Sequence, residues 1–445
     1  MTHLTIAAST DTGWHAAPLT AGAAGAGSAN RGPSAPGGGG RRPLVRFALA
    51  WGLAGATGVA AAALPEVEPA AVQMDPAQLA LIDDVVDRGV RRGDYPGAVV
   101  LVGRHGRIAF QRAYGDRIRI PRREPMRLDT VFDVASLTKV LVTAPAVMQL
   151  SEAGSLSLED RLGDLVPACS SPDRRDIRVR QLLAHESGLR RVFTERMLRR
   201  IRSYQDGVAM ACAEEMTARP GEQLSYGDLN YILLGEIVRR VSGAELDQYA
   251  YRHILRPLGM NETYYNPPAA LRARLAGEDV MTGEVENGVA TRMGGVSGHS
   301  GLYSTAADLA VFSAMLLNGG AWRGVRILSA ESVKRMTTAM VRHARGTRGY
   351  GFDVATGFSG SRGTLFPCDS YGHTGYSGVS MWLDPNSDTF VIVLTNRLHP
   401  DGKGQVKVLR EEVATIAAGA LRDLRYTRDA DAPLNPAHRC RAGRG

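Results

Sequence analysis

The sequence predicts a mixed α/β (α+β) fold: an antiparallel sheet flanked by helices, with an inserted, mainly helical domain. Two observations predict it. Strand-like runs occur only near the two ends of the main domain, and helix-like apolar periodicity fills its middle, from about residue 140 to 328. Because sheets and helices bury their apolar faces against each other, strands from the two ends are expected to meet in one sheet.

The N-terminal part of this sheet follows an amphipathic helix. Residues 76–93 repeat apolar side chains at helical spacing. Two runs of strand-forming residues come next, 98–102 and 108–110, and the glycines of 103–106 indicate a turn between them. This order predicts a helix followed by a hairpin.

The C-terminal part is predicted from three further runs. Residues 350–352, 379–383 and 390–394 are rich in aromatic and other apolar side chains. Residues 384–388, Asp-Pro-Asn-Ser-Asp, supply the turn between the last two runs. Residues 405–421 have the apolar period of an amphipathic helix, so the domain is expected to close with a helix.

Two segments precede the main domain. Residues 1–42 are rich in Gly, Ala, Ser and Thr without an apolar period, so they are predicted to be disordered. Segment 43–65 has a basic start, an uncharged run at 47–64 and small residues before Pro65, which is typical of a secretory signal peptide. The alternative is membrane attachment through an uncleaved anchor at 47–64. Both interpretations predict an exported protein.

The main domain is predicted at residues 74–425. Its sheet part would comprise 74–135 and 330–425, its helical part 136–329, and 426–445 would form a flexible tail. Apolar residues make up 44% of the chain, enough to bury a sizeable core. The formal charge of +8 is scattered apart from an arginine-rich stretch at 174–202. That stretch also carries acidic residues and indicates a solvated helical surface, so nucleic acid is not an expected partner. Nothing in the sequence indicates an oligomeric state.

The cysteines carry no recognisable motif. They are Cys169, Cys212, Cys368 and Cys440, and no pair has the short spacing of a zinc or redox site. We expect them to be small core or surface residues. The alternative is one disulfide, as in many exported proteins, but spacing alone does not identify the pair. The sequence shows no metal-ligand cluster and no phosphate-binding loop, so no cofactor is expected.

The main chemical signal is the pair Ser136 and Lys139. They stand at i and i+3 in a largely apolar run, 136–150, that predicts a buried helix kinked by Pro145. Burial of a lysine is costly and would depress its pKa, so that Lys139 could take a proton from the serine hydroxyl. Ser136 would stand at a helix N-terminus, which favours developing negative charge. The alternative is a lysine that extends to the surface beside an N-cap serine.

Two further elements could complete a site. Tyr226 lies on the approach to a helix, and a tyrosine near a cationic lysine can relay a proton to a leaving group. His373, Thr374 and Gly375 precede a strand, and an edge strand there could lay its backbone along an extended substrate. The Tyr376 N–H would then form an oxyanion hole with the serine N–H. Taken alone, a packing tyrosine and a glycine-rich hairpin would explain these residues equally well.

In this order and spacing, Ser-x-x-Lys at 136–139, Tyr-x-Asp at 226–228 and His-Thr-Gly at 373–375 resemble the serine β-lactamase and penicillin-binding-protein superfamily. The nearer relatives look like class C β-lactamases, low-molecular-weight D-alanyl-D-alanine carboxypeptidases and family VIII carboxylesterases. The resemblance covers roughly residues 76–420 and implies a β-lactamase/transpeptidase-like fold.

The resemblance also implies roles. Ser136 would be the nucleophile, Lys139 the base, Tyr226 the proton relay, and the strand at 373–375 would lie beside the substrate. Two residues depart from the family pattern, which usually has an amide at Asp228 and often a lysine at the first position of the third motif. An ionised carboxylate cannot donate to a substrate carbonyl, and a neutral histidine would hold a substrate carboxylate less firmly than a lysine.

The loop 294–301 could face the cleft, but His299 is given no role beyond that of a structural loop residue. The loop leads into a helix expected to start near 304–305. Asp308 is expected to complete a capping box at the start of that helix.

Together these features predict an exported serine hydrolase that forms an acyl-enzyme on Ser136 and cleaves D-alanyl peptide amides or β-lactams. The alternative enzyme is a carboxylesterase acting on small acyl esters. A rival of another class is a non-catalytic binding protein on the same scaffold. The sequence does not rank peptide, lactam and ester, because substrate choice depends on loop shape and electrostatics.

Overall fold

The computed structural model describes residues 63–277, 288–424 and 426. The expected disordered segment 1–42 lies outside the described residues, as do nearly all of the expected signal peptide or anchor and of the C-terminal tail. In the part of the chain that the structure describes, no helix combines the length and the apolar character needed to cross a membrane.

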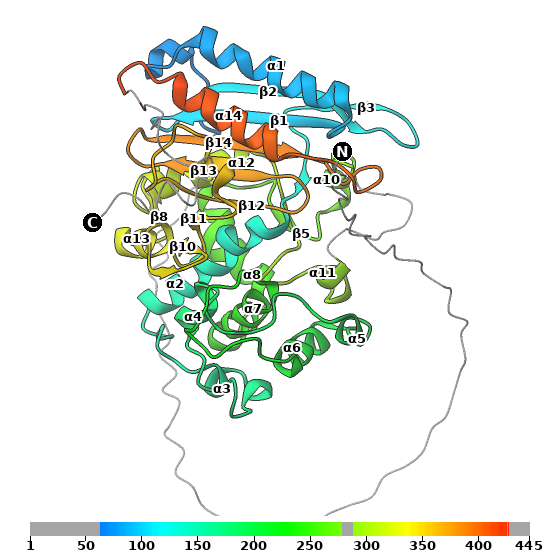
Figure 1. The fold of residues 1–445 in the computed structure, drawn as a ribbon, viewed down its shortest axis with the longest axis vertical. Helices are drawn as coiled ribbons and strands as arrows, with labels where there is room; N and C mark the ends of the chain where they lie inside the picture. Colours follow the sequence, from blue (N-terminus) through cyan, green and yellow to red (C-terminus); the bar gives the residue numbers. More distant parts are fainter. Residues whose placement is uncertain (1–62, 278–287, 425, 427–445) are drawn as a thin grey trace, which may run out of the picture. The chain divides into compact units, whose positions relative to one another are not determined.

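Within the described residues, strands from both ends of the domain form one nine-stranded antiparallel sheet (Figure 1). The two ends meet where β1 pairs with β14, with Ala98 opposite Thr395 and Arg104 opposite Thr389. This meeting is the one that the sequence predicts. In order across the sheet, the strands are β3 (Glu124–Pro125), β2 (Arg107–Ile118), β1 (Gly97–Arg104), β14 (Thr389–Thr395), β13 (Ser380–Asp384), β12 (Tyr371–Thr374), β11 (Asp353–Thr356), β10 (Gly346–Arg348) and β9 (Val341–His343).

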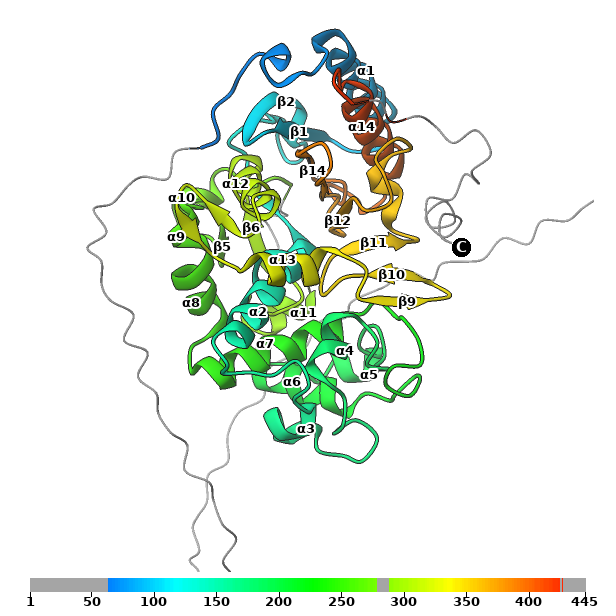
Figure 2. The ribbon, with the colours of Figure 1, turned by 90° about the vertical axis from the view of Figure 1, so that its left-hand side faces the viewer.

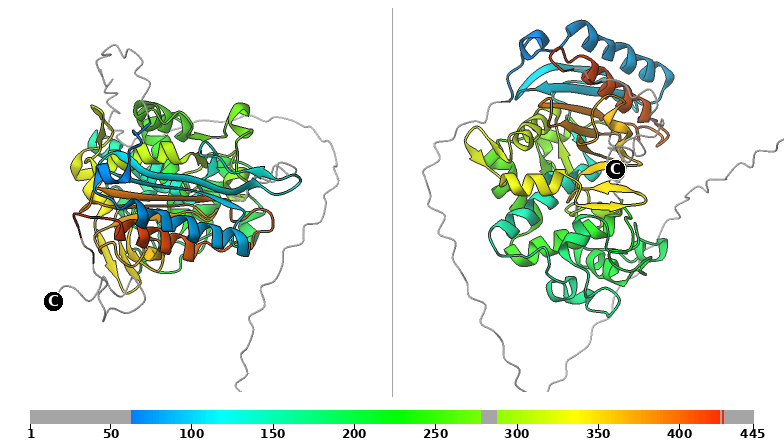
Figure 3. Two further views of the ribbon diagram at one scale, coloured as in Figure 1. Left: turned by 90° about the horizontal axis from the view of Figure 1, so that it is seen from above. Right: turned by 60° about the vertical axis from the view of Figure 1, so that its left-hand side comes forward.

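Helices cover both faces of this sheet. The first and last helices, α1 (Pro76–Arg92) and α14 (Lys407–Gly419), lie side by side across one face (Figures 1 and 3). Helix α12 (Ala306–Leu317) packs against the other face, where it contacts β1, β13 and β14. Side chains alternate along a strand, so β1 serves both layers: Val99 faces the core shared with the helical part, and Val100 faces the core under α1 and α14.

The remaining helices form the part inserted between the two halves of the sheet. At its centre α7 is almost entirely buried and packs against α2, α4 and α6. The helices are α2 (Ala144–Glu152), α3 (Leu162–Leu165), α4 (Val179–Leu183), α5 (Glu195–Leu198), α6 (Tyr204–Ala213), α7 (Asp228–Ser242), α8 (Leu246–Ala250), α9 (Arg256–Leu258), α10 (Ala269–Arg272), α11 (Gly288–Arg292) and α13 (Ala330–Thr337). Short strands also occur here: β4 (Phe132–Asp133), β6 (Leu302–Ser304), β5 (Tyr264–Tyr265), β7 (Ala321–Trp322) and β8 (Val325–Arg326).

The hairpin β9–β10 ties the free edge of the sheet to the helical part (Figure 2). His343 on β9 forms a hydrogen-bonded pair with Glu186, which follows α4. The two side chains are largely buried at this junction. The junction therefore holds the two walls of the cleft described below against each other.

Two predictions about the strands were wrong in detail. Residues 350–352 do not form a strand, because Gly351 has φ 113°, a conformation that breaks strand geometry, and β11 begins only at Asp353. Residues 103 and 104 belong to β1 rather than to the predicted turn, which is shorter.

For the cysteines, the structure shows buried residues, as expected, and the alternative of a disulfide. Cys169 and Cys212 form a disulfide with their Cα atoms 4.8 Å apart, although 43 residues separate them in the sequence. Packing of α6 against the turn that ends at Cys169 brings them together, and sequence spacing carries no signal of that contact. No described cysteine is free.

Candidate active site

Ser136 stands at an irregular junction between strand β4 and helix α2. The chain first forms a 3-10 turn at Ala135–Leu137, in which Ala135 has φ 45°, and then a wider π-helical turn at Lys139–Thr143. In place of the predicted single kinked helix, the chain therefore forms a 3-10 turn, then a π-helical turn, and then α2. Pro145 falls in the first turn of α2, where its missing N–H is tolerated, rather than at a kink within a helix. Wide turns of this kind occur often at functional sites.

Lys139 lies beneath Ser136 and is completely buried. Its Nζ atom is 2.9 Å from Ser136 Oγ, 2.8 Å from Asp228 Oδ1 and 2.9 Å from the carbonyl oxygen of His299. An ammonium group has three N–H donors, and each has an acceptor here. Because the side chain is buried, the alternative of a lysine that extends to the surface is excluded.

The pKa of Lys139 does not follow the prediction. Burial lowers the pKa of this ammonium, but the charge of Asp228 and the contact with Tyr226 raise it by more, so it lies above the ordinary value. Burial raises the pKa of the Asp228 carboxyl, and the Lys139 charge lowers it to below its ordinary value. The resting site therefore contains an ammonium–carboxylate pair. The prediction of a depressed lysine pKa considered burial alone and left out the neighbouring carboxylate.

Tyr226 lies between two cations. Lys139 Nζ is 5.3 Å and the Arg348 guanidinium carbon 5.3 Å from the centre of its ring. The His185 ring lies 4.6 Å away on the inner side. Arg191 Nε donates to the Tyr226 carbonyl oxygen at 2.9 Å, which fixes the backbone of this segment.

His185 is a positioning residue that sequence reasoning did not assign. Its Nδ1 accepts a hydrogen bond from the Gly227 N–H at 3.2 Å. Burial, followed by the charges of Arg348 and Lys139, lowers the pKa of His185 well below its ordinary value, so the ring is neutral and its Nδ1 is free to accept. The ring thereby holds the turn that carries Tyr226 and Asp228.

The predicted edge strand is not at an edge of the sheet. β12 lies between β13 and β11, but it pairs with β11 only through Gly372 and Asp353. Beyond that pair, the side of β12 at His373 and Thr374 is unpaired toward β11. The prediction needed unpaired backbone groups that a substrate could contact. His373 and Thr374, the last two residues of β12, have them on the side toward β11.

The residues that end β12 are tightly constrained. The His373 side chain is buried, its Nδ1 lies 2.8 Å from the Thr374 carbonyl oxygen, and burial lowers its pKa well below the ordinary value. A Cβ atom on Gly375 would lie 2.5 Å from Val379 Cγ2, so only glycine fits there. Tyr376, by contrast, is 68% exposed, with the Arg397 guanidinium 4.5 Å from its ring centre.

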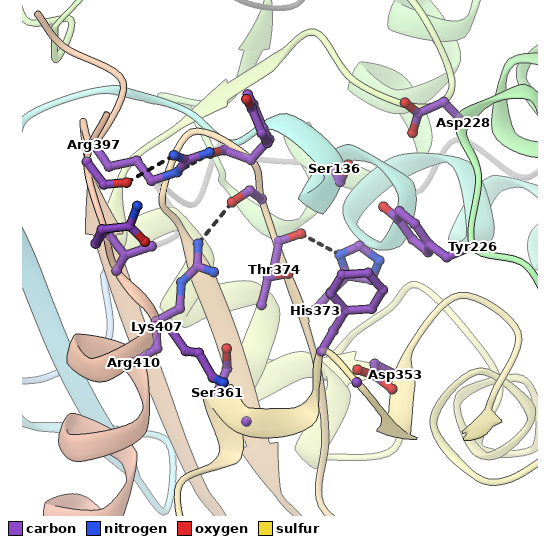
Figure 4. Close-up of a pocket in the computed structure, with 18 of the residues that line it drawn as sticks. Ser136, Tyr226, Asp228, Asp353, Ser361, His373, Thr374, Arg397, Lys407 and Arg410 are labelled. Atoms are coloured by element: carbon purple, nitrogen blue, oxygen red, sulfur yellow. Dashed lines mark hydrogen bonds between the residues drawn. The ribbon is translucent and has the colours of Figure 1, made fainter. Parts of the chain in front are cut away.

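A cleft of about 580 Å³ joins these elements (Figure 4). Ser136, Tyr226 and His373 face it from one side, and Arg397 and Arg410 lie on the other. All predicted site residues except the buried Lys139 line this cleft: Ser136, Tyr226, Asp228, His373, Thr374, Gly375 and Tyr376. Among the described residues, no group of three or more His, Cys, Asp or Glu side chains is arranged to hold a metal ion.

His299 has a part that the sequence analysis did not assign. Its backbone carbonyl accepts a hydrogen bond from Lys139, and its buried ring contacts Ser297 Oγ at 2.7 Å. Burial lowers the pKa of His299 to about 4, which keeps the ring neutral beside the ion pair. A backbone carbonyl leaves no mark on residue type, so the sequence could not reveal this contact.

The helix after this loop begins as predicted, but its capping box is incomplete. Thr305 is the N-cap of α12, and its Oγ1 accepts a hydrogen bond from the Asp308 N–H. The Asp308 carboxylate accepts hydrogen bonds from the N–H of Glu262 and the hydroxyl of Thr263 instead of returning to the cap. A long-range contact has replaced the local one.

Comparison with known proteins identifies the family. Residues 82–414, which make up most of the chain, match the Beta-lactamase family. The protein belongs to the β-lactamase family. Ser136, Lys139 and Tyr226 all lie inside the matched region.

Relatives of this β-lactamase-family chain include proteins of Escherichia coli and Bacillus subtilis. It is 29% identical over 343 residues to an Escherichia coli K12 protein named "Putative D-alanyl-D-alanine carboxypeptidase", covering 68% of this chain and 79% of that protein. It is 28% identical over 378 residues to the Bacillus subtilis N-acetylmuramyl-L-alanine amidase, covering 75% and 85% of the two chains. Among solved structures, the hydrolase EstCE1 has a TM-score of 0.64 at 21% identity and covers 76% of this chain and 98% of its own. Family membership and these relatives support a hydrolase.

Proposed function

We propose that this β-lactamase-family protein is an exported serine hydrolase that forms an acyl-enzyme on Ser136 and cleaves D-alanyl peptide amides, or β-lactams as their mimics. One observation carries the proposal: in a cleft of substrate size, the Ser136 hydroxyl lies 2.9 Å from the amine of a fully buried lysine. The names of the cell-wall relatives support this substrate class.

Lys139 can activate Ser136 only after the ion pair between Lys139 and Asp228 has lost its charges by proton transfer. Burial is the largest influence on both partners, lowering the pKa of Lys139 and raising that of Asp228. The Asp228 side chain is still 32% exposed, so a bound substrate that excludes water increases this influence. A proton then passes from Lys139 to Asp228, and the neutral amine takes the proton of Ser136 as Oγ attacks the carbonyl carbon.

Negative charge develops on the carbonyl oxygen during this attack. In the part of the chain that the structure describes, the backbone N–H groups of Ser136 and Tyr376 donate to no protein acceptor, so both remain available as an oxyanion hole. Tyr226 then supplies a proton to the leaving amine and recovers one from the Lys139 ammonium. Water hydrolyses the acyl-enzyme by the same transfers in reverse.

Export is proposed on two grounds. An intramolecular disulfide, here Cys169–Cys212, is typical of proteins in oxidising compartments. Segment 43–65 has the composition of a signal peptide. The cell wall, as the source of the proposed substrate, lies in the same compartment.

A carboxylesterase is the second candidate, and one observation favours it. His373 is neutral and buried where a lysine would provide a cation for a substrate carboxylate, and Asp228 replaces an amide donor. Both changes reduce contacts that a peptide or lactam needs and that a small ester does not need.

The test is the mass of the intact protein after incubation with benzylpenicillin, with Ser136→Ala as the matched variant. A gain of one penicilloyl group on the wild type alone supports the proposal. A gain on both proteins would contradict Ser136 as the nucleophile. If neither protein gains mass, turnover of p-nitrophenyl esters that is lost in Ser136→Ala would identify the esterase, and absence of all turnover would favour the binding-protein alternative.

A further inference from the structure

A side branch of the cleft, beside Tyr226, is lined by three arginines. This cavity of about 160 Å³ lies between the segment 224–226, the loop at Phe358 and the hairpin β9–β10. Arg191, Arg345 and Arg348 line it, and no acidic residue does. It shares Tyr226 and Phe358 with the main cleft, so a ligand at Ser136 can extend into it.

The protein itself neutralises these charges poorly. Arg345, at the tip of the β9–β10 hairpin, is exposed and makes no hydrogen bond or ion pair within the described residues. Arg191 uses its Nε on the Tyr226 carbonyl oxygen, and no described carboxylate pairs with it. Each therefore has guanidinium donors directed to solvent or to a ligand.

Arg348 is the stronger indication of a built site. It is 1% exposed, its Nη2 donates to the Gly351 carbonyl oxygen at 2.7 Å, and its Nε has no hydrogen-bond partner. Its ion pair with Asp353 is long, with Nη1 3.8 Å from Oδ1, and leaves Nε without an acceptor. A buried donor without a partner is costly, and an anion in the cavity would supply the missing acceptor and charge.

We infer that this arginine branch is a carboxylate subsite, which binds an acidic side chain of the peptide substrate next to the bond cleaved at Ser136. The inference rests on the proposed function and specifies its substrate class: an acidic peptide. Guanidinium groups bind carboxylates through paired, charge-assisted hydrogen bonds, which fix the orientation as well as adding affinity. The cavity, of about 160 Å³, is large enough for the side chain of one glutamate, and Tyr226 is among the residues that line it.

The position of the branch gives it a role distinct from the residues at the end of β12. His373 and Thr374 lie in the main cleft and do not line the branch, and Arg397 and Arg410 lie on the opposite side of that cleft. A substrate that filled both the main cleft and the arginine branch would be recognised by two separate sets of residues. The neutral His373 would then be offset by charge recognition elsewhere, at the arginines beside Tyr226.

Binding to the full-length Ser136→Ala variant tests the subsite without turnover. The probes are two acetylated peptides that end in D-alanyl-D-alanine and differ only in an upstream glutamate or glutamine. We expect the glutamate peptide to bind roughly tenfold more tightly in calorimetry at low salt. Adding Arg345→Gln should lower this ratio roughly threefold without changing the affinity for the glutamine peptide, because Arg191 and Arg348 remain. Arg345 is suited to this test because it holds no other part of the site.

The matched control is Ser136→Ala with Arg91→Gln, which removes one exposed arginine on α1 and should leave the ratio unchanged. Equal affinities for the two peptides, a ratio that Arg345→Gln leaves unchanged, or no binding of either peptide would overturn the subsite. Penicilloylation of Ser136 in the wild type is measured separately, so failure of the subsite is distinguishable from failure of the proposed function.

Discussion

Lys139 Nζ lies within hydrogen-bond distance of both Asp228 Oδ1, at 2.8 Å, and Ser136 Oγ, at 2.9 Å. The residue expected to activate the serine is thus paired in the resting site with a carboxylate that the family pattern usually lacks. The pair raises the pKa of Lys139 and lowers that of Asp228, so each partner is held in its charged form.

Replacing Asp228 by asparagine tests this relationship. The variant Asp228→Asn keeps a hydrogen-bond acceptor but removes the charge. The largest influence that raises the pKa of Lys139 is then lost, and burial, which lowers it, is opposed only by Tyr226. We expect acylation by benzylpenicillin to become roughly tenfold faster, on the scale of a moderate gain in general-base catalysis. The acid limb of the pH–rate profile should move to lower pH, because the amine loses its proton more easily. A loss as complete as that of Ser136→Ala would show instead that the carboxylate is required.

The proton-accepting role of Lys139 is tested by Lys139→Arg. A guanidinium can still pair with Asp228 but does not lose its proton at working pH. Acylation should fall on the order of 10³-fold. Melting temperature checks that the buried site tolerates the larger side chain. Unchanged acylation in a folded variant would rule out a lysine base.

Tyr226→Phe separates amide from ester chemistry. An amide leaving group must be protonated as the bond breaks, whereas p-nitrophenolate leaves without a proton. Cleavage of D-alanyl-D-alanine peptides should fall roughly 10²-fold, and acylation by p-nitrophenyl acetate should change far less. Equal losses on both substrates would point to a positioning role for the tyrosine instead of proton transfer.

The disulfide should stabilise the helical part without contributing to catalysis. Closing a loop with a sequence separation of 43 residues restricts the unfolded chain, worth about 4 kcal/mol in the loop-entropy estimate. The variant Cys169→Ser with Cys212→Ser should lower the free energy of unfolding by an amount of that order in urea titration. Its Ser136 acylation rate at 25 °C should equal that of the wild type, and a matching loss of acylation would contradict a purely structural role.

His299 makes stability depend on pH. Burial lowers the pKa of His299 from 6.5 to about 4, so its stabilising contribution is complete above pH 6.5 and declines as the pH falls toward 4. The total loss is on the order of 3 kcal/mol. Between pH 7 and 4.5, the melting temperature of the wild type should therefore fall more steeply than that of His299→Gln. Parallel curves for the two proteins would contradict this assignment.

The fold could be predicted to the extent that local patterns encode it. The helix that became α1 has its N-cap at Asp75 and its C-cap at Gly93, and the apolar runs on β1 and β14 have the length and composition of buried strands. The sequence also placed the two halves of the chain in one sheet. It could not give the register between them, since pairing over nearly 300 residues depends on the packed core.

The site was predictable where side-chain type carries the chemistry, as at Ser136, Lys139 and Tyr226. Contacts made by backbone atoms or between distant segments left no such signal. The His299 carbonyl and the His185 ring needed the three-dimensional structure, and so did the direction of the Lys139 pKa. In each case the contact joins residues that lie far apart in the sequence, as Lys139 and Asp228 do.

Because β1 pairs with β14, the sheet that supports the site can be completed only late in synthesis. Ser136 leaves the ribosome early, but the strand that faces it, β12, is held in place by β13 and β14, which are made last. A nascent chain that stops before Thr389 has Ser136 and β12 but lacks β14, the strand that joins β13 to β1. Under the proposed function, acyl transfer would therefore require translation past the last strand, and we expect a C-terminal truncation into β14 to yield an inactive polypeptide rather than a weakened enzyme.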